Sequence, residues 1–170
     1  STLDEYKVAL DAGLTPEAAL KAVARRSRDN ARTPMQWTGE ENAGFTAGTP
    51  WLRVNSNYTA INVEKETIDP NSVLNFNKKL IALRKEKDII VYGEFEPLCR
   101  EDNQIFAYMR KLDEERLLTV CNFSEHVAEM EIPEEFQKNA ECLITNLGRK
   151  DFGKKVVLKP YEAFVLYRNL

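Results

Sequence analysis

The spacing of apolar residues divides the chain near residue 88 into a helical part and a strand-like part. Apolar positions three or four residues apart predict one helix before Gly13. A second helix starts at Thr15-Pro16, a favourable pair of N-cap and first helical residue. A third opens at Asp69-Pro70 and carries a clear apolar stripe of Val73, Phe76, Leu80 and Leu83.

Residues 27–71 show little periodicity and are rich in Pro, Gly, Asn and Thr. This stretch far exceeds the usual connection of about 4–6 residues. It carries both tryptophans, Trp37 and Trp51, and its composition is not that of a disordered linker. We therefore expect a long loop that packs against protein and lines a functional site.

From residue 89 onwards, short apolar runs alternate with turn signals about every ten residues, a pattern typical of an antiparallel sandwich. Apolar and mixed positions alternate within 104–111, which predicts one core face and one wetter face. The predicted strands are 89–92, 95–99, 104–111, 117–123, 127–132, 141–145, 155–158 and 163–168. No sugar platform is expected on them, because core packing is expected for most of Phe106, Tyr108, Phe123, Phe164 and Tyr167.

Composition and charge limit the classes of function that this chain can have. A hydrophobic share of 43%, a charged share of 30% and a net charge of -3 are typical of a globular domain without a basic nucleic-acid surface. No apolar run reaches the roughly 18 residues of a membrane span. Cys99, Cys121 and Cys142 lack metal or disulfide spacing, and His126 is the only histidine, so no metal site is predicted. No secretory signal opens the chain, and we expect a cytoplasmic protein.

One ten-residue run is far more specific than these patterns. The segment Arg28–Trp37, followed by Asn42-Ala43-Gly44-Phe45 and Pro50-Trp51, resembles a motif of family 13 α-glucosidases. Residues 72–85 resemble the last barrel helix of that family, and residues 158–163 its last hairpin. Within the family the chain is most similar to oligo-1,6-glucosidases and dextran glucosidases. Trehalose-6-phosphate hydrolases and sucrose isomerases share much of the region.

The resemblance implies an α+β fragment. Residues 1–88 would form the last part of a catalytic (β/α)8 barrel, and residues 89–170 an antiparallel β-sandwich domain. A whole barrel needs roughly 250 residues, more than the 170 of this chain. The long loop would follow the eighth barrel strand, on the face where such barrels hold their active sites.

Retaining glycosidases cleave with two carboxyl groups about 5–5.5 Å apart. In the family these groups, and a third carboxylate, come from earlier barrel strands, and their motifs do not occur in this chain. We therefore expect no catalytic residue here and no turnover by the chain alone. No metal or organic cofactor is implied, since the calcium loop of some relatives has no counterpart in this sequence.

The resemblance assigns substrate binding to the loop. Arg32 would grip hydroxyls of the terminal glucose at the −1 subsite, with an upstream aspartate as its partner; Arg28 is the alternative, and Asp29 would orient one of the two. A guanidinium fork suits paired oxygen acceptors. Either arginine could instead tie the loop to the barrel. Trp37 either stacks on a sugar or pins the loop, with packing favoured, and Gln36 is a further candidate.

Two function classes follow. The first is a fragment of a hydrolase that removes α-1,6-linked glucose from non-reducing ends, or of a sister enzyme acting on trehalose 6-phosphate or sucrose. Its partners would be an α-glucan oligosaccharide and the remainder of the barrel, not nucleic acid or a membrane. The second is a stand-alone β-sandwich binding or interaction module.

The helical stripe of residues 73–83 discriminates between the two classes. Cover by the chain's own strands would favour the module, and exposure would favour the fragment. Exposed stripes would also make the isolated chain self-associate.

Overall fold

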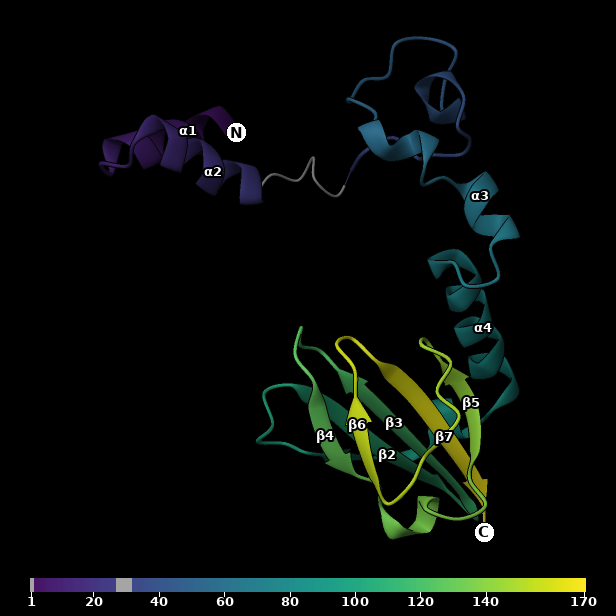
Figure 1. Cartoon of the computed structure of the whole chain (residues 1–170). Helices are drawn as coiled ribbons and strands as arrows, with labels where there is room; N and C mark the ends of the chain where they lie inside the picture. Colours follow the sequence, from purple (N-terminus) through teal and green to yellow (C-terminus); the bar gives the residue numbers. More distant parts are fainter. Residues whose placement is uncertain (1, 27–31) are drawn as a thin grey trace. The chain divides into compact units, whose positions relative to one another are not determined.

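The chain folds as two compact units, Ser1–Asp69 and Pro70–Leu170, in a computed structural model that describes residues 2–26 and 32–170 (Figure 1). The expected domain boundary at residues 88 and 89 differs from this division and stays a prediction about the parent protein. None of the described helices is long and apolar enough to cross a membrane.

The first unit begins with a helical pair, α1 (Thr2–Asp11) and α2 (Pro16–Arg26), as the sequence predicted. Gly13 joins them with a φ of 86°, a left-handed conformation that glycine adopts without steric cost. The hydroxyl of Thr15 accepts a hydrogen bond from the Ala18 amide at 3.3 Å, which confirms Thr15 as the cap of α2.

Residues 32–69 are not a loop throughout. They contain two 3-10 turns, η2 (Glu41–Gly44) and η3 (Ser56–Thr59), and a short helix α3 (Val63–Ile68). The expectation of unbroken loop was wrong at α3, because six residues are too few to show helical periodicity. The available signal was the N-cap Asn62 followed by Glu64 and Glu66 in the first turn.

The second unit begins with helix α4 (Val73–Glu86), capped by the Ser72 side chain rather than at the expected Asp69-Pro70. Residues Ile89–Tyr92 form helix α5, so the predicted first strand was wrong. A four-residue apolar run carries no periodicity that separates helix from strand. Backbone hydrogen bonds from Tyr92 to Asp88 and from Gly93 to Ile89 settle it as a turn of helix.

The remaining predicted strands are confirmed within one or two residues and form two antiparallel sheets (Figure 1). The five-stranded sheet has the order β1-β2-β3-β7-β5, and β4 pairs with β6 in a smaller sheet. A short turn, η4 (Glu134–Phe136), follows β4. The strands are β1 (Glu94–Leu98), β2 (Ile105–Leu112), β3 (Glu115–Asn122), β4 (Ala128–Glu131), β5 (Glu141–Thr145), β6 (Lys155–Leu158) and β7 (Ala163–Asn169).

The core lies between these two sheets. Alternate residues of each strand face inward, so the small sheet covers one face of the large one. The fully buried side chains of this core include Leu118, Val120, Leu158, Phe164 and Leu166. The predicted antiparallel sandwich is therefore confirmed. The expectation of core packing for most of Phe106, Tyr108, Phe123, Phe164 and Tyr167 was wrong, because among them only Phe164 belongs to this core.

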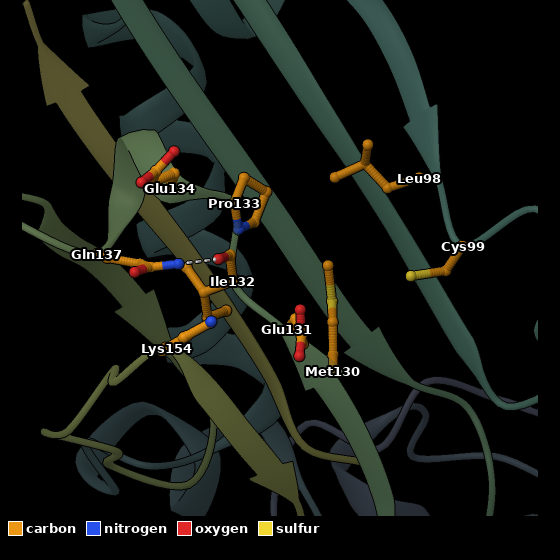
Figure 2. Close-up of a pocket in the computed structure, with 9 residues that line it drawn as sticks. All are labelled: Leu98, Cys99, Met130, Glu131, Ile132, Pro133, Glu134, Gln137 and Lys154. Carbon is orange, nitrogen blue, oxygen red and sulfur yellow. Dashed lines mark hydrogen bonds between the residues drawn. The ribbon is translucent and has the colours of Figure 1, made fainter.

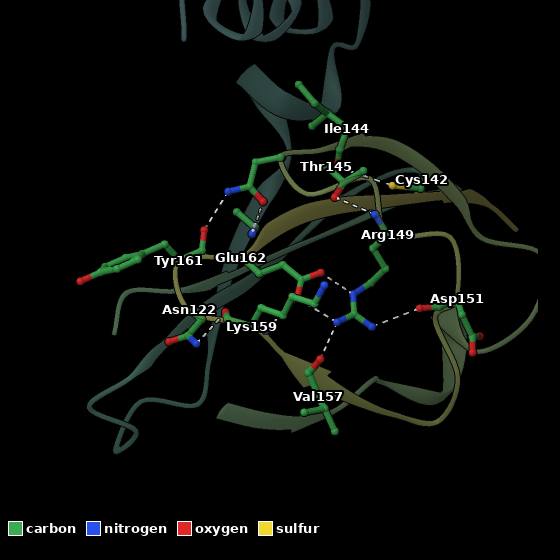
Figure 3. A network of polar contacts seen from close by, with 12 residues as sticks. Asn122, Cys142, Ile144, Thr145, Arg149, Asp151, Val157, Lys159, Tyr161 and Glu162 are labelled. Atoms are coloured by element: carbon green, nitrogen blue, oxygen red, sulfur yellow. Dashed lines mark hydrogen bonds and ion pairs between the residues drawn. The ribbon is translucent and has the colours of Figure 1, made fainter. Parts of the chain in front are cut away.

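A buried ion pair ties the loops at one end of the sandwich (Figure 3). The guanidinium of Arg149 donates two hydrogen bonds to the Glu162 carboxylate, at 2.7 and 2.9 Å, and a third to the Val157 carbonyl. The Lys159 amide adds a fourth contact, to Glu162. The Arg149 bonds hold the pKa of Glu162 below its usual range. Only 3% of the Glu162 side chain is exposed, so this charge depends on its partner.

Glu162→Gln should lower the free energy of unfolding by about 3 kcal/mol at pH 7, because it leaves Arg149 without its buried counter-charge. The folded-state pKa of Glu162 is depressed, so the ion pair stabilises fully above the unfolded pKa of about 4.3 and less as pH falls through the folded value. Urea unfolding followed by circular dichroism between pH 3 and 7 measures this.

The matched control is Glu129→Gln, which breaks the exposed pair with Lys155 and should leave the unfolding free energy nearly unchanged. Equal losses in the two variants would contradict the role given to Glu162.

Gly93→Ala should destabilise the second unit by about 1–3 kcal/mol through overpacking. A Cβ at residue 93 would lie 2.5 Å from the Ile89 carbonyl oxygen and 3.1 Å from the Cβ of Arg110. Gly153→Ala is the control, since a Cβ there meets nothing within 4 Å. Both are compared by urea unfolding with circular dichroism, because both tryptophans lie in the other unit. Equal midpoints would show that α5 shifts freely.

Candidate functional site

The loop predicted to bind substrate is described from Arg32 onwards. Arg28 and Asp29 lie outside the described residues. Arg32 is exposed. Gln36 is half-buried, whereas Trp37 keeps 49% of its surface exposed. The structure therefore places Arg32, Gln36 and Trp37 on one short segment that runs into the packed part of the loop.

The backbone around Trp37 is held by a tight turn. The amides of Trp37 and Thr38 both donate to the Ala43 carbonyl, at 2.9 and 3.1 Å. Asn42 and Ala43 reach that position with φ of 52° and 58°, which non-glycine residues rarely adopt. Gly44 follows with φ 65°, and a Cβ there would lie 2.6 Å from the Thr38 hydroxyl. Asn42 and Gly44 suit these left-handed positions in the turn at Trp37, whereas Ala43 adopts its conformation at an energetic cost.

Helix α3 is locked to the same segment through its own N-terminus. The Val63 and Glu64 amides donate to the carbonyls of Gln36 and Trp37, at 2.9 and 3.0 Å. The third amide, from Lys65, bonds the buried Asn62 side chain at 2.9 Å. These contacts satisfy donors that a helix start otherwise leaves unpaired. Residues 36–37 are therefore rigid relative to α3.

Gln36 has an internal role that the sequence did not reveal. Its side-chain nitrogen donates to the Asn57 side chain at 3.1 Å and to the Ile61 carbonyl at 2.5 Å. These bonds brace the loop across more than twenty residues. The Trp37 side chain differs, because half of its surface is open to a sugar or to protein outside this chain. A role in substrate binding stays a prediction for both residues.

The described residues form neither a metal site nor an activated cysteine nucleophile. No group of three or more His, Cys, Asp or Glu within them is placed to hold a metal ion. Cys99, Cys121 and Cys142 are free and half-buried, and burial raises the pKa of each thiol. A raised thiol pKa disfavours the nucleophilic thiolate.

A cleft of about 580 Å³ lies in the second unit, beside the end of β1 and the strand β4 (Figure 2). Its apolar lining includes Leu98, Met130 and Pro133, and the side chain of Gln137 donates to the Ile132 carbonyl at 2.8 Å. Among the described residues predicted to bind substrate, Arg32, Gln36 and Trp37, none lines this cleft. It is a separate feature of the sandwich.

The comparisons with known proteins agree with this architecture. Residues 2–93 match the family described as alpha amylase, catalytic domain, and residues 105–165 match the alpha-amylase SusG C-terminal domain. The first match includes the loop and both α4 and α5. The second covers most of the strands.

Individual relatives match almost the whole chain. The oligo-1,6-glucosidase of Parageobacillus thermoglucosidasius is 45% identical in an alignment of 168 residues that covers 96% of this chain and 30% of that enzyme. The probable oligo-1,6-glucosidase 2 of Bacillus subtilis is also 45% identical, over 94% of this chain and 29% of its own length. The trehalose-6-phosphate hydrolase structure from Bacillus licheniformis matches with a TM-score of 0.91 at 38% identity, over 99% of this chain and 31% of that one.

The chain thus spans about 30% of the length of these relatives and corresponds to a part of a longer protein of their kind. Its first 93 residues carry the catalytic-domain match, and its strands carry the C-terminal-domain match. The chain belongs to the alpha-amylase family, glycoside hydrolase family 13.

Proposed function

We propose that this chain is the C-terminal part of an α-glucosidase that hydrolyses α-1,6-linked glucose oligosaccharides from the non-reducing end with retention of configuration. The observation that carries the proposal is the 45% identity over 96% of the chain to an oligo-1,6-glucosidase. A glucan 1,6-alpha-glucosidase of Streptococcus pneumoniae, 39% identical over 96% of the chain, supports the same linkage. The partners would be the oligosaccharide and the remainder of the barrel, in the cytoplasm.

The alternative function within the family is that of a related enzyme acting on trehalose 6-phosphate or sucrose. A trehalose-6-phosphate hydrolase of Bacillus subtilis is 38% identical, and an isomaltulose synthase structure from Klebsiella is 37% identical with a TM-score of 0.84. Both values are below those of the oligo-1,6-glucosidases. The ordering of identities favours α-1,6-linked glucose as the substrate class.

The exposed surface of α4 supports a fragment rather than a stand-alone module. No residue of this helix is buried. Within the stripe, Val73 and Leu80 keep 73% and 40% of their surface exposed, and Phe76 and Leu83 are half-buried. The pair α1 and α2 likewise leaves apolar side chains exposed, including Leu3, Val8 and Leu20. Apolar stripes of this size are normally covered by protein. In the proposed enzyme, the remainder of the barrel would cover these side chains.

Within the intact enzyme, we assign Arg32 to the −1 subsite, with Arg28 as the alternative and Asp29 as the group that orients one of them. The hydrogen bonds at residues 36–37 would anchor the segment that leads to Arg32. A guanidinium held in this way positions the sugar and does not itself break a bond.

The isolated chain should show no turnover of isomaltose or of p-nitrophenyl α-glucoside above buffer. Cleavage with retention needs a pair of carboxyl groups, and the family's motifs for them lie outside this sequence. Release of glucose and of nitrophenol measures the rate. Clear turnover that disappears on replacing an acidic residue of the chain would contradict the proposal.

A chimera tests the role proposed for the arginine. This chain replaces the matched 30% of the Parageobacillus thermoglucosidasius enzyme, and the chimera should hydrolyse isomaltose. Arg32→Ala should lower kcat/KM for isomaltose by about a hundred-fold, because a misplaced substrate loses reactive geometry. Arg53→Ala, an exposed arginine of the same loop, is the control. Equal kcat/KM values for the two variants would remove Arg32 from the subsite.

A further inference from the structure

Both N–H donors of the Gln36 side-chain amide are used inside the loop. A glutamine amide nitrogen carries two such donors. One donates to the Asn57 side-chain oxygen at 3.1 Å and the other to the Ile61 carbonyl oxygen at 2.5 Å. Because a main-chain carbonyl can only accept, it fixes which end of the Gln36 amide faces it. The nitrogen of Gln36 therefore has no N–H left for a sugar hydroxyl.

The two partners of this amide belong to a region with hydrogen bonds of its own. Asn57 lies in η3, and its main-chain carbonyl accepts from the Ile61 amide at 2.9 Å. Asn62, directly after Ile61, is buried, donates to the Tyr58 carbonyl at 2.8 Å and caps α3. The Gln36 side chain is thus attached to a part of the loop that holds its own conformation.

The main chain of Gln36 and Trp37 is bound to the same region. The Gln36 carbonyl accepts from the Val63 amide at 2.9 Å, and the Trp37 carbonyl accepts from the Glu64 amide at 3.0 Å. Since Trp37 keeps 49% of its surface exposed, the place of its ring depends on the backbone that carries it. Gln36 holds that backbone through both its side chain and its carbonyl.

The segment from Arg32 to Gln36 extends this restraint towards the predicted arginine. Pro34 lies in the middle of the segment and is buried. Its ring fixes its own φ and restricts Thr33 before it to extended conformations. A buried proline and a doubly bonded glutamine therefore lie between the two exposed side chains predicted to bind substrate, Arg32 and Trp37.

We propose that Gln36 is a positioning residue of the substrate site. Its two N–H donors hold Trp37 and the segment that leads to Arg32 in place, and it acts on the sugar through these two neighbours. The sequence predicted a direct contact between Gln36 and substrate, for which only the oxygen of the amide remains. The proposal rests on the proposed function, because it concerns the site of that enzyme.

Gln36→Glu separates the two roles, since it keeps the shape and the oxygen acceptors of the side chain and removes both donors. In the chimera with the Parageobacillus thermoglucosidasius enzyme, it should lower kcat/KM for isomaltose by about tenfold or more, mostly through kcat, because a displaced sugar loses reactive geometry. Gln36→Met removes the donors without adding a charge and should lose as much. A kcat/KM retained in either variant would overturn the proposal.

Gln137→Glu is the matched control. The Gln137 side chain is half-buried and donates to the Ile132 carbonyl at 2.8 Å, as Gln36 does to Ile61. Loss of this bond should lower the midpoint of thermal unfolding while kcat and KM stay unchanged. A Gln36→Glu variant that likewise changed only the midpoint would make Gln36 merely structural, against the proposal.

A double-mutant cycle tests the route through Asn57. Asn57→Leu removes one acceptor and should itself lower kcat/KM, whereas the double variant should lose no more than Gln36→Glu alone. If the two single losses multiplied, Gln36 would act elsewhere and the proposal would fail. Should Gln36→Glu not fold, Asn57→Leu carries the test, because it leaves the bond to Ile61, and an unchanged kcat/KM would then count against the proposal.

Amide hydrogen exchange measures the restraint without turnover. In the chimera, Gln36→Glu should speed exchange in peptides that contain Trp37 and Val63, whose amides are bonded within the loop, and leave peptides of the sandwich unchanged. Equal exchange with and without the substitution would refute the positioning role. A chimera that is inactive on isomaltose, yet shows the faster exchange, would contradict the proposed function alone.

Discussion

The structure of the second unit depends on one constraint: its five-stranded sheet is apolar on both faces. The inner face is covered by β4 and β6, and the outer face only in part by α5. A two-layer sandwich in water alternates apolar and polar residues along each strand, whereas a sheet covered on both sides does not. The requirement for a second cover explains why Ile89–Tyr92 turn into a helix on that face. It also explains the close approach at Gly93, where a Cβ would meet both Ile89 and Arg110.

The first unit meets a different requirement, that of holding a long irregular segment still. It does so with backbone groups: the carbonyls of Gln36 and Trp37 cap α3, and the Ala43 carbonyl anchors Trp37 and Thr38. The hydrogen bonds that hold the loop come from the main chain and from the side-chain amides of Gln36 and Asn62. The side chains of Arg32 and Trp37 therefore remain exposed. A loop built in this way can present side chains to a substrate without relying on them for its own stability.

The features that followed from the sequence are those set by local chemistry. Thr15-Pro16 fixed a helix start, and the alternation of β2 identified its core face correctly. The features that were missed depend on contacts between distant residues. Nothing local separates Ile89–Tyr92 from a strand, and nothing in Phe106 or Phe123 shows that the wetter face is also apolar. The candidate site was located by the motif at residues 28–37, while the bracing role of Gln36 needed the positions of Asn57 and Ile61.

These two constraints bear on how a family 13 enzyme would use this part of its chain. Under the proposed function, Arg32 would have to stay fixed relative to carboxylates on a different stretch of the polypeptide. The hydrogen bonds of the loop hold only residues 36–37 relative to α3. The loop alone has no fixed position relative to the rest of the barrel. Burial of the apolar surfaces of α4 and of the sheet against the barrel would supply it, because it would hold the strands in place beside the last barrel helix. The strands, for which no sugar contact is predicted, would then act on catalysis through packing.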